Sequence, residues 1–208
     1  MKLFPPLYFV TPPLGDVNAI ERLIYEVVEG GVQMVQIRDK GSVRKIIEVA
    51  RRIHPFLQKR NVPLIINDRV DIAHVVKAEG VHVGQSDLSL SEVRTLLGPE
   101  CIVGISIENE GQLGSIAGAD YVAASPLFAT KSKEDSAPPI GLKGLRALRE
   151  AISLPLIAIG GIDLEHLPAI VEAGIDGIAV VSALASAADP RARAAAFLKA
   201  WERLQANP

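Results

Sequence analysis

Short apolar runs recur along the chain at similar intervals, and each run is bounded by glycine, proline or polar residues. Eight runs can be recognised: Leu7–Val10, Met34–Ile37, Leu64–Ile66, Val81–Val83, Ile102–Ile105, Tyr121–Ala124, Leu156–Ile159 and Gly177–Val181. Runs of this length that are rich in valine and isoleucine are typical of strands buried on both faces of a parallel sheet. The pattern therefore predicts parallel strands separated by covering segments.

The segments between these runs carry helix signals. Ser89 and Glu92 have the spacing of a capping box, and Asp189 stands before Pro190 as a capping carboxylate ahead of an alanine-rich last helix. Glycines that can close helices follow several of the segments: Gly30-Gly31, Gly118 and Gly174. Helices are thus expected between the strands.

Eight strand–helix alternations predict a single (β/α)8 TIM barrel over residues 1–208. An open doubly wound sheet is the alternative, but the chain lacks the glycine-rich first turn that such folds often carry. The one long irregular segment, Ser125–Leu142, contains three prolines and several charged residues. Long loops in ordered domains are usually lids or binding loops, so a binding role is expected for it.

The overall composition is that of an ordinary globular protein, with 49% hydrophobic and 22% charged residues. The net charge of −2 provides no basic field for DNA or RNA, so a small phosphorylated ligand is the expected partner. The single Cys101 cannot form an intrachain disulfide, which favours the cytoplasm, and its apolar neighbours favour a buried structural thiol.

No membrane segment is expected from the sequence. The first residues contain Lys2 and a short apolar run that Pro5 and Pro6 interrupt, which does not match a signal peptide. No stretch approaches the roughly 20 apolar residues that span a bilayer.

Polar residues directly follow most of the predicted strands. They are Gln36-Ile37-Arg38-Asp39-Lys40, Asn67-Asp68-Arg69, Gly84-Gln85-Ser86-Asp87, Ser106, the segment with Thr130, Lys131, Ser132 and Lys133, Gly160-Gly161, and Val181-Ser182. In a barrel the carboxyl ends of all strands meet at one face, where active sites are built. These residues are therefore expected to surround one cavity.

Asp68 and Asp87 follow neighbouring strands and are the candidate ligands of Mg²⁺. Magnesium is a hard cation that is commonly held by one or two carboxylates together with water and substrate phosphates. For either aspartate alone, a helix cap or a turn is the competing interpretation. The paired placement favours the metal.

Arg38, Lys40 and Lys133 are the candidate diphosphate ligands, since arginine binds phosphate bidentately and lysine acts as a point charge. Solvated surface charge is the competing interpretation, and it fits Lys131 and Lys143 better than Arg38, which follows an apolar strand directly. Asn67 is placed to orient the diphosphate or the metal.

The turns at Gly160-Gly161 and Val181-Ser182 predict a second phosphate site, because the loops after strands seven and eight often bind phosphate in barrels. A glycine pair alone often marks only a turn, and Ser182 strengthens the prediction. Two phosphate sites at one mouth imply two phosphorylated substrates or one long substrate.

Other catalytic motifs are not found. The sequence has no Walker-type phosphate loop, no G-x-G-x-x-G and no H-E-x-x-H, and its four histidines have no zinc spacing. His82 lies within a predicted strand and is interpreted as a core residue. Nothing indicates a Ser–His–Asp triad.

With these residues identified, the sequence resembles the thiamine phosphate synthase family from Tyr8 to Asp189. The resemblance lies in the blocks GGVQMVQIRDK, PLIINDRVDIA, GVHVGQSDL, GISIEN, GADYVAASPLFATKSKEDSAPPIGLKGL, IAIGGI and GIAVVSAL. It implies that a pyrimidine diphosphate is condensed with a thiazole phosphate.

The resemblance also implies roles for individual residues. Magnesium would bind at Asp68 and Asp87, and Arg38, Ser106 and Lys133 would be catalytic. The substrate-binding positions would be Gln36, Ile37, Arg38, Asp39, Lys40, Asn67, Ser106, Thr130, Lys131, Ser132, Lys133, Gly161, Val181 and Ser182.

Some positions depart from the family pattern. Ser132 stands where threonine is common, Asp39 replaces a frequent glutamate, and Pro12-Pro13 replaces an acidic residue. Glu108 occupies a place where relatives often carry histidine. In the sister branch, the thiazole tautomerases, a histidine near that position is important, so Glu108 favours the synthase.

Three other functions stay open at this point: a thiazole tautomerase, an epimerase or other sugar-phosphate barrel enzyme, and a non-catalytic regulator that binds thiazole phosphate. A homodimer is compatible with the sequence, which contains no signal that decides the oligomeric state.

Overall fold

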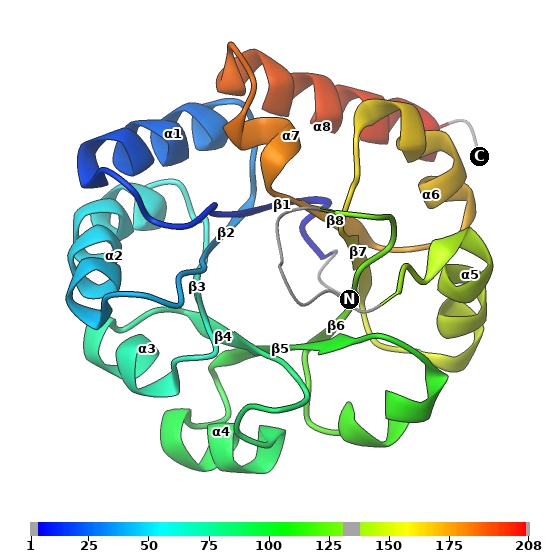
Figure 1. Cartoon of the computed structure of the whole chain (residues 1–208), viewed down its shortest axis with the longest axis horizontal. Helices are drawn as coiled ribbons and strands as arrows, with labels where there is room; N and C mark the ends of the chain where they lie inside the picture. The colour runs from blue at the N-terminus through cyan, green and yellow to red at the C-terminus, as the bar shows by residue number, and fades with distance from the viewer. Residues whose placement is uncertain (1–3, 131–137, 207–208) are drawn as a thin grey trace.

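The chain folds into a closed barrel of eight parallel strands, with helices on the outside (Figure 1). The structure, a computed structural model, describes residues 4–130 and 138–206. Each strand pairs with the next one along the chain, and β8 pairs with β1 to close the ring. The strands are β1 (Leu7–Val10), β2 (Met34–Ile37), β3 (Leu64–Asn67), β4 (Gly80–Val83), β5 (Ile102–Ile107), β6 (Tyr121–Ala124), β7 (Leu156–Ile159) and β8 (Gly177–Val180). The predicted (β/α)8 barrel is confirmed.

Helices cover the barrel between most strands. They are α1 (Val17–Glu29), α2 (Val43–Gln58), α3 (Val70–Val76), α4 (Leu90–Leu97), α5 (Gly141–Ala151), α6 (Leu167–Glu172), α7 (Ser182–Ala185) and α8 (Pro190–Ala206), with the short 3-10 helices η1 (Glu110–Ser115) and η2 (Leu164–His166). A full helix was expected after β5, but only η1 forms there. Gly111 and Gly114 fall within its six residues, and glycine strongly disfavours α-helix.

The predicted helix caps form as expected. Ser89 accepts a hydrogen bond from the backbone of Glu92, and the Glu92 side chain accepts one from the backbone of Ser89, so the capping box is complete. Asp189 accepts from the backbone of Ala192 at the start of α8. These local signals fix where α4 and α8 begin.

Two hydrophobic layers hold the barrel together. Along β1, Leu7 and Phe9 belong to the large cluster between strands and helices, whereas Tyr8 and Val10 point into the barrel. This alternation follows from the two-residue period of a strand. The interior cluster is smaller and consists of Tyr8, Val10, Met34, Ile65, Tyr121, Ala123, Ile157 and Ala179.

The last helix closes the outer layer by packing on the first. A Cβ added at Gly30 would lie 2.4 Å from the carbonyl oxygen of Arg191 and 2.7 Å from the Cβ of Ala194. Gly30 therefore both ends α1 and leaves the space into which α8 fits. Among the described helices, none combines the length and apolar character needed to cross a membrane.

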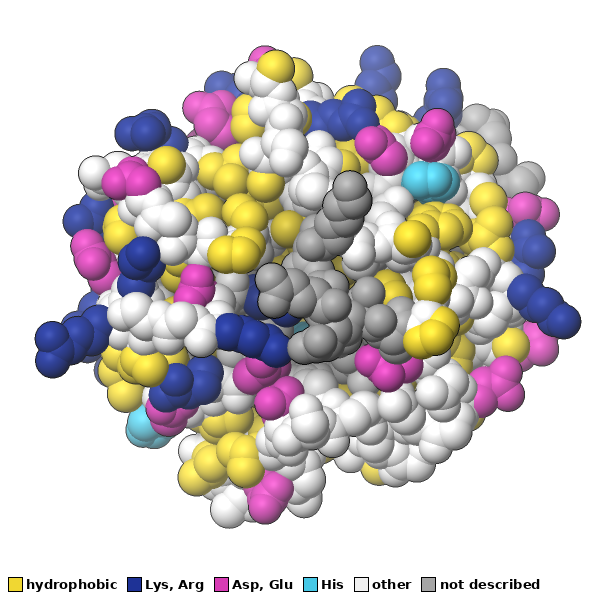
Figure 2. Space-filling view, viewed as in Figure 1, with side chains coloured by type: hydrophobic (Ala, Val, Ile, Leu, Met, Phe, Trp, Pro, Cys, Tyr) yellow, Lys and Arg dark blue, Asp and Glu magenta, His cyan; other side chains and the backbone are white. Residues whose placement is uncertain are grey.

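The long segment after β6 is shorter than expected at its far end, because α5 begins at Gly141. Its two described ends are joined by backbone hydrogen bonds from Ile140 to Pro126 and from Gly141 to Leu127. The segment therefore leaves and rejoins the barrel at one place, beside β6 and β7. The face in Figure 2 carries Lys and Arg side chains mixed with Asp and Glu around its outline.

Candidate functional site

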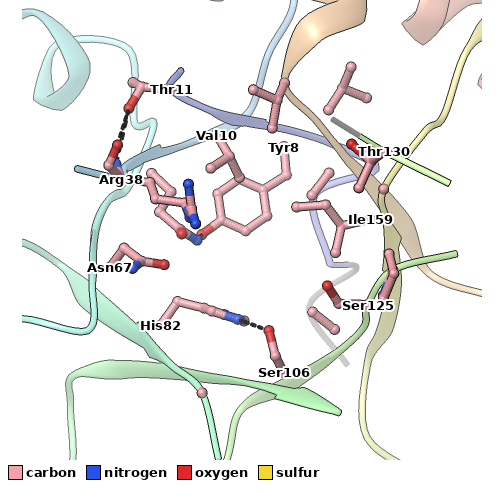
Figure 3. Close-up of a pocket in the computed structure, with 18 of the residues that line it drawn as sticks. Tyr8, Val10, Thr11, Arg38, Asn67, His82, Ser106, Ser125, Thr130 and Ile159 are labelled. Atoms are coloured by element: carbon pink, nitrogen blue, oxygen red, sulfur yellow. Dashed lines mark hydrogen bonds between the residues drawn. The ribbon is translucent and has the colours of Figure 1, made fainter. Parts of the chain in front are cut away.

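A cavity of about 530 Å³ opens at the carboxyl ends of the strands. Its lining includes most of the predicted site residues that the structure describes: Gln36, Arg38, Lys40, Asn67, Asp68, Asp87, Ser106, Thr130, Gly161, Val181 and Ser182. Figure 3 shows Arg38 and Asn67 on one side of this cavity and Thr130 and Ile159 on the opposite side. Residues from Gln36 to Ser182 therefore meet at one mouth. Lys131, Ser132 and Lys133 lie outside the described residues.

Two predicted contacts do not match the placement of their side chains. Ile37 is 1% exposed and packs in the layer between strands and helices, because its neighbours Gln36 and Arg38 take the inward positions. The carboxylate of Asp39 accepts backbone hydrogen bonds from Leu14 and Gly41, both at 2.6 Å. Asp39 thus ties the loop after β2 to the loop after β1, and neither side chain lines the cavity.

Asp68 and Asp87 lie in contact on one side of the mouth, after the neighbouring strands β3 and β4. Burial, the charge of Asp87 and a hydrogen bond between the two carboxyl groups together raise the pKa of Asp68 to about 6. Arg38 and Lys40 oppose this shift. One oxygen of Asp87 also accepts from the backbone of Gly84 at 2.7 Å, so the turn role considered for this residue coexists with its exposure to the cavity.

The backbone at Asp68 is held in the left-handed region, with φ of 59°. Aspartate tolerates this region better than most residues, yet the conformation still has a cost. The amide of Asp68 donates to the carbonyl of His82 at 2.8 Å, which extends the β3–β4 ladder by one residue. The strand ends thus aim the carboxylate of Asp68 toward that of Asp87, and the side chain does not cap α3.

Arg38 is positioned by a buried threonine that sequence reasoning missed. Thr11 is 1% exposed, accepts from the amide of Arg38 at 3.0 Å and lies 3.4 Å from its carbonyl oxygen (Figure 3). Within residues 4–130 and 138–206, neither the Arg38 guanidinium nor the Lys40 ammonium forms an ion pair within 4.0 Å. Both cations line the cavity and are held near the acidic pair.

The opposite side of the mouth is built from the ends of β7 and β8. Gly160 and Gly161 have φ of 107° and 64°, and a Cβ at Gly161 would lie 2.6 Å from the carbonyl oxygen of Ala129. Only glycine therefore lets the segment after β6 approach this turn closely. Ser182 begins α7 directly after β8 and lines the same part of the cavity.

Tyr8 and His82 form the floor of the cavity, and neither was predicted as a site residue. His82 is buried, as its position in a strand predicted, and both of its ring nitrogens are hydrogen-bonded. Burial lowers the pKa of His82 to about 4 against the opposing charge of Asp87, and burial raises the pKa values of Tyr8 and Tyr121. Aromatic residues with polar ends at inward strand positions were the signal that could have found them.

The acidic pair fits a magnesium ion. Two carboxyl groups lie in contact, and burial and mutual repulsion raise the pKa of one of them, so a divalent cation between them would relieve the repulsion. The described part of the chain contains no cluster of three or more metal-ligating side chains. A pair of hard oxygen ligands leaves positions for water and phosphate oxygens, which is the arrangement that magnesium favours.

The fold and this cavity define the chain as a (β/α)8-barrel protein whose mouth has acidic and basic residues on one side and a glycine turn on the other. Residues 7–184 match the family described as thiamine monophosphate synthase. The chain belongs to this family.

Individual relatives agree over nearly the whole length. The chain is 46% identical over 189 residues to a thiamine-phosphate synthase of Vibrio campbellii, a match that covers 89% of this chain and 93% of the relative. It is 46% identical over 201 residues to one of Syntrophomonas wolfei, covering 95% and 96%. The solved thiamine phosphate pyrophosphorylase of Pyrococcus furiosus superposes with a TM-score of 0.84 at 30% identity, covering 96% of each chain.

Proposed function

We propose that this chain is a transferase that joins hydroxymethylpyrimidine diphosphate to hydroxyethylthiazole phosphate, forming thiamine phosphate and releasing pyrophosphate. Family membership supports this reaction, because the similar curated proteins are named thiamine-phosphate synthases at 40–46% identity over most of their length. The observation that carries the proposal is that one mouth has the cations Arg38 and Lys40 on one side and the Gly161 turn with Ser182 on the other, which would suit two phosphorylated groups.

The diphosphate belongs on the side formed by β2, β3 and β4. Arg38 and Lys40 supply positive charge there, and Asp68 and Asp87 would hold Mg²⁺. When bound, the metal would neutralise the diphosphate charge that Arg38 and Lys40 leave uncompensated. Asn67 and Gln36 line the same side and would orient the diphosphate and the pyrimidine ring.

The thiazole phosphate belongs on the side formed by β7 and β8. Gly161, Val181 and Ser182 line this part of the cavity, and Thr130 lies next to it. Backbone amides of glycine turns and a serine hydroxyl are neutral donors that suit a phosphate monoester. Lys131, Ser132 and Lys133 would extend this contact from the segment after β6, and Lys133 would also reach the diphosphate.

The reaction would proceed by a dissociative substitution. The bond between the pyrimidine methylene carbon and the diphosphate oxygen breaks with both electrons leaving on pyrophosphate, and Arg38, Lys40 and Lys133 stabilise that charge. The thiazole nitrogen then donates its lone pair to the methylene cation and forms the new C–N bond. No proton needs to move, so the site requires no general base, and holding the two substrates together contributes much of the rate.

Ser106 would contact the pyrimidine from the end of β5, between the two phosphate sides. The Ser125–Leu142 segment would close over the mouth during the reaction, and its described ends are joined to each other by the bonds from Ile140 to Pro126 and from Gly141 to Leu127. Excluding water matters here because water would capture the cation.

The thiazole tautomerase is the second candidate, and it needs neither diphosphate nor metal. The contact between Asp68 and Asp87 favours the synthase, because an isomerase of the neutral ring has no use for two facing carboxylates.

The absence of a basic field on the chain and its single cysteine support small-molecule substrates and a cytoplasmic location. A homodimer stays a prediction.

The test is direct synthesis. The purified protein is incubated with both phosphorylated substrates, with Mg²⁺ or with EDTA, and thiamine phosphate and pyrophosphate are measured. We expect both products in equal amounts with Mg²⁺ and a loss of orders of magnitude with EDTA. Product formation that is unaffected by EDTA would contradict the metal site, and thiazole isomerisation without thiamine phosphate would identify the tautomerase instead.

A further inference from the structure

A continuous chain of hydrogen bonds crosses the inside of the barrel beneath the cavity. Gln36 Nε2 donates to Tyr8 Oη at 2.6 Å, and Tyr8 Oη lies 3.1 Å from Tyr121 Oη. Tyr121 Oη lies 2.9 Å from His82 Nδ1. His82 Nε2 lies 2.8 Å from Ser106 Oγ, and Figure 3 shows this last bond. Five side chains from β2, β1, β6, β4 and β5 are thus connected in a row.

The four residues of the row other than Ser106 are buried, so they have few other hydrogen-bond partners. Gln36, Tyr8, Tyr121 and His82 are between 0% and 7% exposed, and burial keeps the phenols and the imidazole in their neutral forms. Every buried polar side-chain atom among the described residues has a partner. The number of protons in this row of hydrogen bonds is therefore fixed. What is left to determine is which partner donates in each bond.

With the amide nitrogen of Gln36 facing Tyr8, the count of donors and acceptors gives one direction. Tyr8 Oη already receives a hydrogen from Gln36, so its own hydrogen has Tyr121 Oη as the remaining acceptor. The hydrogen of Tyr121 is then directed to His82 Nδ1. A neutral imidazole with an unprotonated Nδ1 carries its hydrogen on Nε2, and this nitrogen donates to Ser106 Oγ.

Ser106 stands at the end of the row, on the wall of the cavity. Because its oxygen receives the hydrogen of His82, its own hydrogen has to point elsewhere, and the cavity is where Ser106 is open. With the opposite direction, Ser106 would donate to His82 and present only lone pairs to the substrate. The Tyr8 hydrogen would then have no acceptor unless the Gln36 amide were reversed.

We propose that the row Gln36–Tyr8–Tyr121–His82 holds Ser106 as a hydrogen-bond donor to an acceptor atom on the uncharged ring of the substrate. Tyr8, Tyr121 and His82 are positioning residues that act through Ser106. Ser106 lies on β5, between the side of the mouth with Arg38 and Lys40 and the side with the Gly161 turn and Ser182, and this position favours a ring atom over either phosphate. The inference rests on the proposed function only for the identity of that ring.

Packing supports a fixed row. A Cβ added at Gly104 would lie 2.1 Å from Tyr121 Cζ and 2.5 Å from His82 Nδ1. The absence of a side chain at Gly104 is therefore what lets the Tyr121 hydroxyl reach the imidazole. Phe4 packs against the Tyr121 ring in a tilted arrangement with centroids 5.0 Å apart, a second contact that holds the phenol in place.

The tautomer of His82 in the ligand-free protein tests the direction of the row. Nitrogen-15 NMR of histidine-labelled protein distinguishes a protonated from an unprotonated ring nitrogen, and a His82→Gln variant assigns the signal among the four histidines. We expect hydrogen on Nε2 and none on Nδ1. Hydrogen on Nδ1, or a mixture of the two tautomers, would overturn the inference. This measurement stands even if the protein makes no thiamine phosphate, an outcome that would refute only the proposed function.

A double-mutant cycle tests whether the row acts through Ser106. Tyr121→Phe keeps the ring and removes the hydrogen given to His82, so we expect kcat/KM for the pyrimidine diphosphate to fall roughly tenfold, the worth of one hydrogen bond. In a Ser106→Ala background the same change should cost less than about twofold, since coupled residues are not additive. Equal losses in both backgrounds would show a merely structural role.

Tyr25→Phe is the matched control. Its hydroxyl donates to Glu21 at 2.6 Å on the outside of the barrel, and its removal should leave kcat/KM unchanged. Circular dichroism of each variant checks the fold. If Tyr121→Phe does not fold, the NMR result on the unmodified protein still decides the direction of the row.

Discussion

The two rims of the barrel use the same charged residue types in opposite ways. At the rim where the strands begin, the acidic residues just before β4, β6 and β8 each accept from the backbone of the preceding strand and contact a basic side chain on the helix before that strand. The three groups are Glu79 with Leu64 and His54, Asp120 with Val103 and Arg94, and Asp176 with Leu156 and Arg149. At the other rim, Asp68 and Asp87 face each other.

The difference shows which rim stabilises the fold and which one binds substrate. At the first rim, each carboxylate bonds a basic side chain and a strand amide, as Asp176 does with Arg149 at 2.7 Å and with the amide of Leu156 at 2.8 Å. At the second rim, Asp68 and Asp87 repel each other, and a bound cation would relieve this repulsion. In barrels of this type the active site lies at the second rim, where the strands end, and residues at the first rim serve stability.

The largest effect is expected from Asp87→Asn. Removing this carboxylate takes away one of two metal ligands, so turnover should fall by roughly 10²–10³-fold. The thermal midpoint of the metal-free protein should not fall, because the repulsion with Asp68 is relieved. Steady-state rates and calorimetry measure the two quantities. A variant with near-normal turnover would refute the assigned role of Asp87.

The same chemical change at the other rim should have the reverse outcome. Asp176→Asn leaves Arg149 without its carboxylate, and we expect a loss of about 2 kcal/mol in the free energy of unfolding, or roughly 4–8 °C in Tm. Both partners are partly exposed, which keeps the loss below that of a fully buried pair. The kcat and KM values should stay within about twofold at 25 °C. An Asp176→Asn variant that is stable but inactive would contradict the assignment of a stabilising role to the first rim.

Thr11→Val tests how the second rim is held by uncharged groups. The variant keeps the shape of the side chain and removes the acceptor of the Arg38 amide, so KM for the pyrimidine diphosphate should rise several-fold, with a stability cost of about 1 kcal/mol. Thr95→Val is the control, because its hydroxyl bonds the Ser91 carbonyl on α4 at the surface. If both variants behaved alike, Thr11 would have no special part in placing Arg38.

The smallest effect is expected for an exposed ion pair between two outer helices. Arg146 and Glu172 lie 3.2 Å apart between α5 and α6, and their side chains are 49% and 73% exposed. Solvent screening makes such pairs weak, so Arg146→Ala should change the free energy of unfolding by less than about 0.5 kcal/mol in urea titrations. A larger loss would mean that the strength of the Arg149 pair does not come from its place at the rim.

Much of the fold could be read from the sequence because its signals are local. The apolar runs marked all eight strands to within two residues at their ends, and the Ser89 capping box and Asp189 marked helix starts. Parallel strands place their carboxyl ends together, so Asp68 and Asp87 could be paired before any coordinates were known.

Orientation and long-range contact were decided only by the tertiary structure. Ile37 and Asp39 lie beside Gln36 and Arg38 in the sequence, yet the two-residue period of β2 and the bonds of Asp39 to Leu14 and Gly41 turn them away from the cavity. The hydroxyls of Tyr8 and Tyr121 meet although 113 residues separate them. Closing the barrel brings such pairs together, because its interior is shared by strands from the whole chain, and no local pattern specifies which side chains face each other across it.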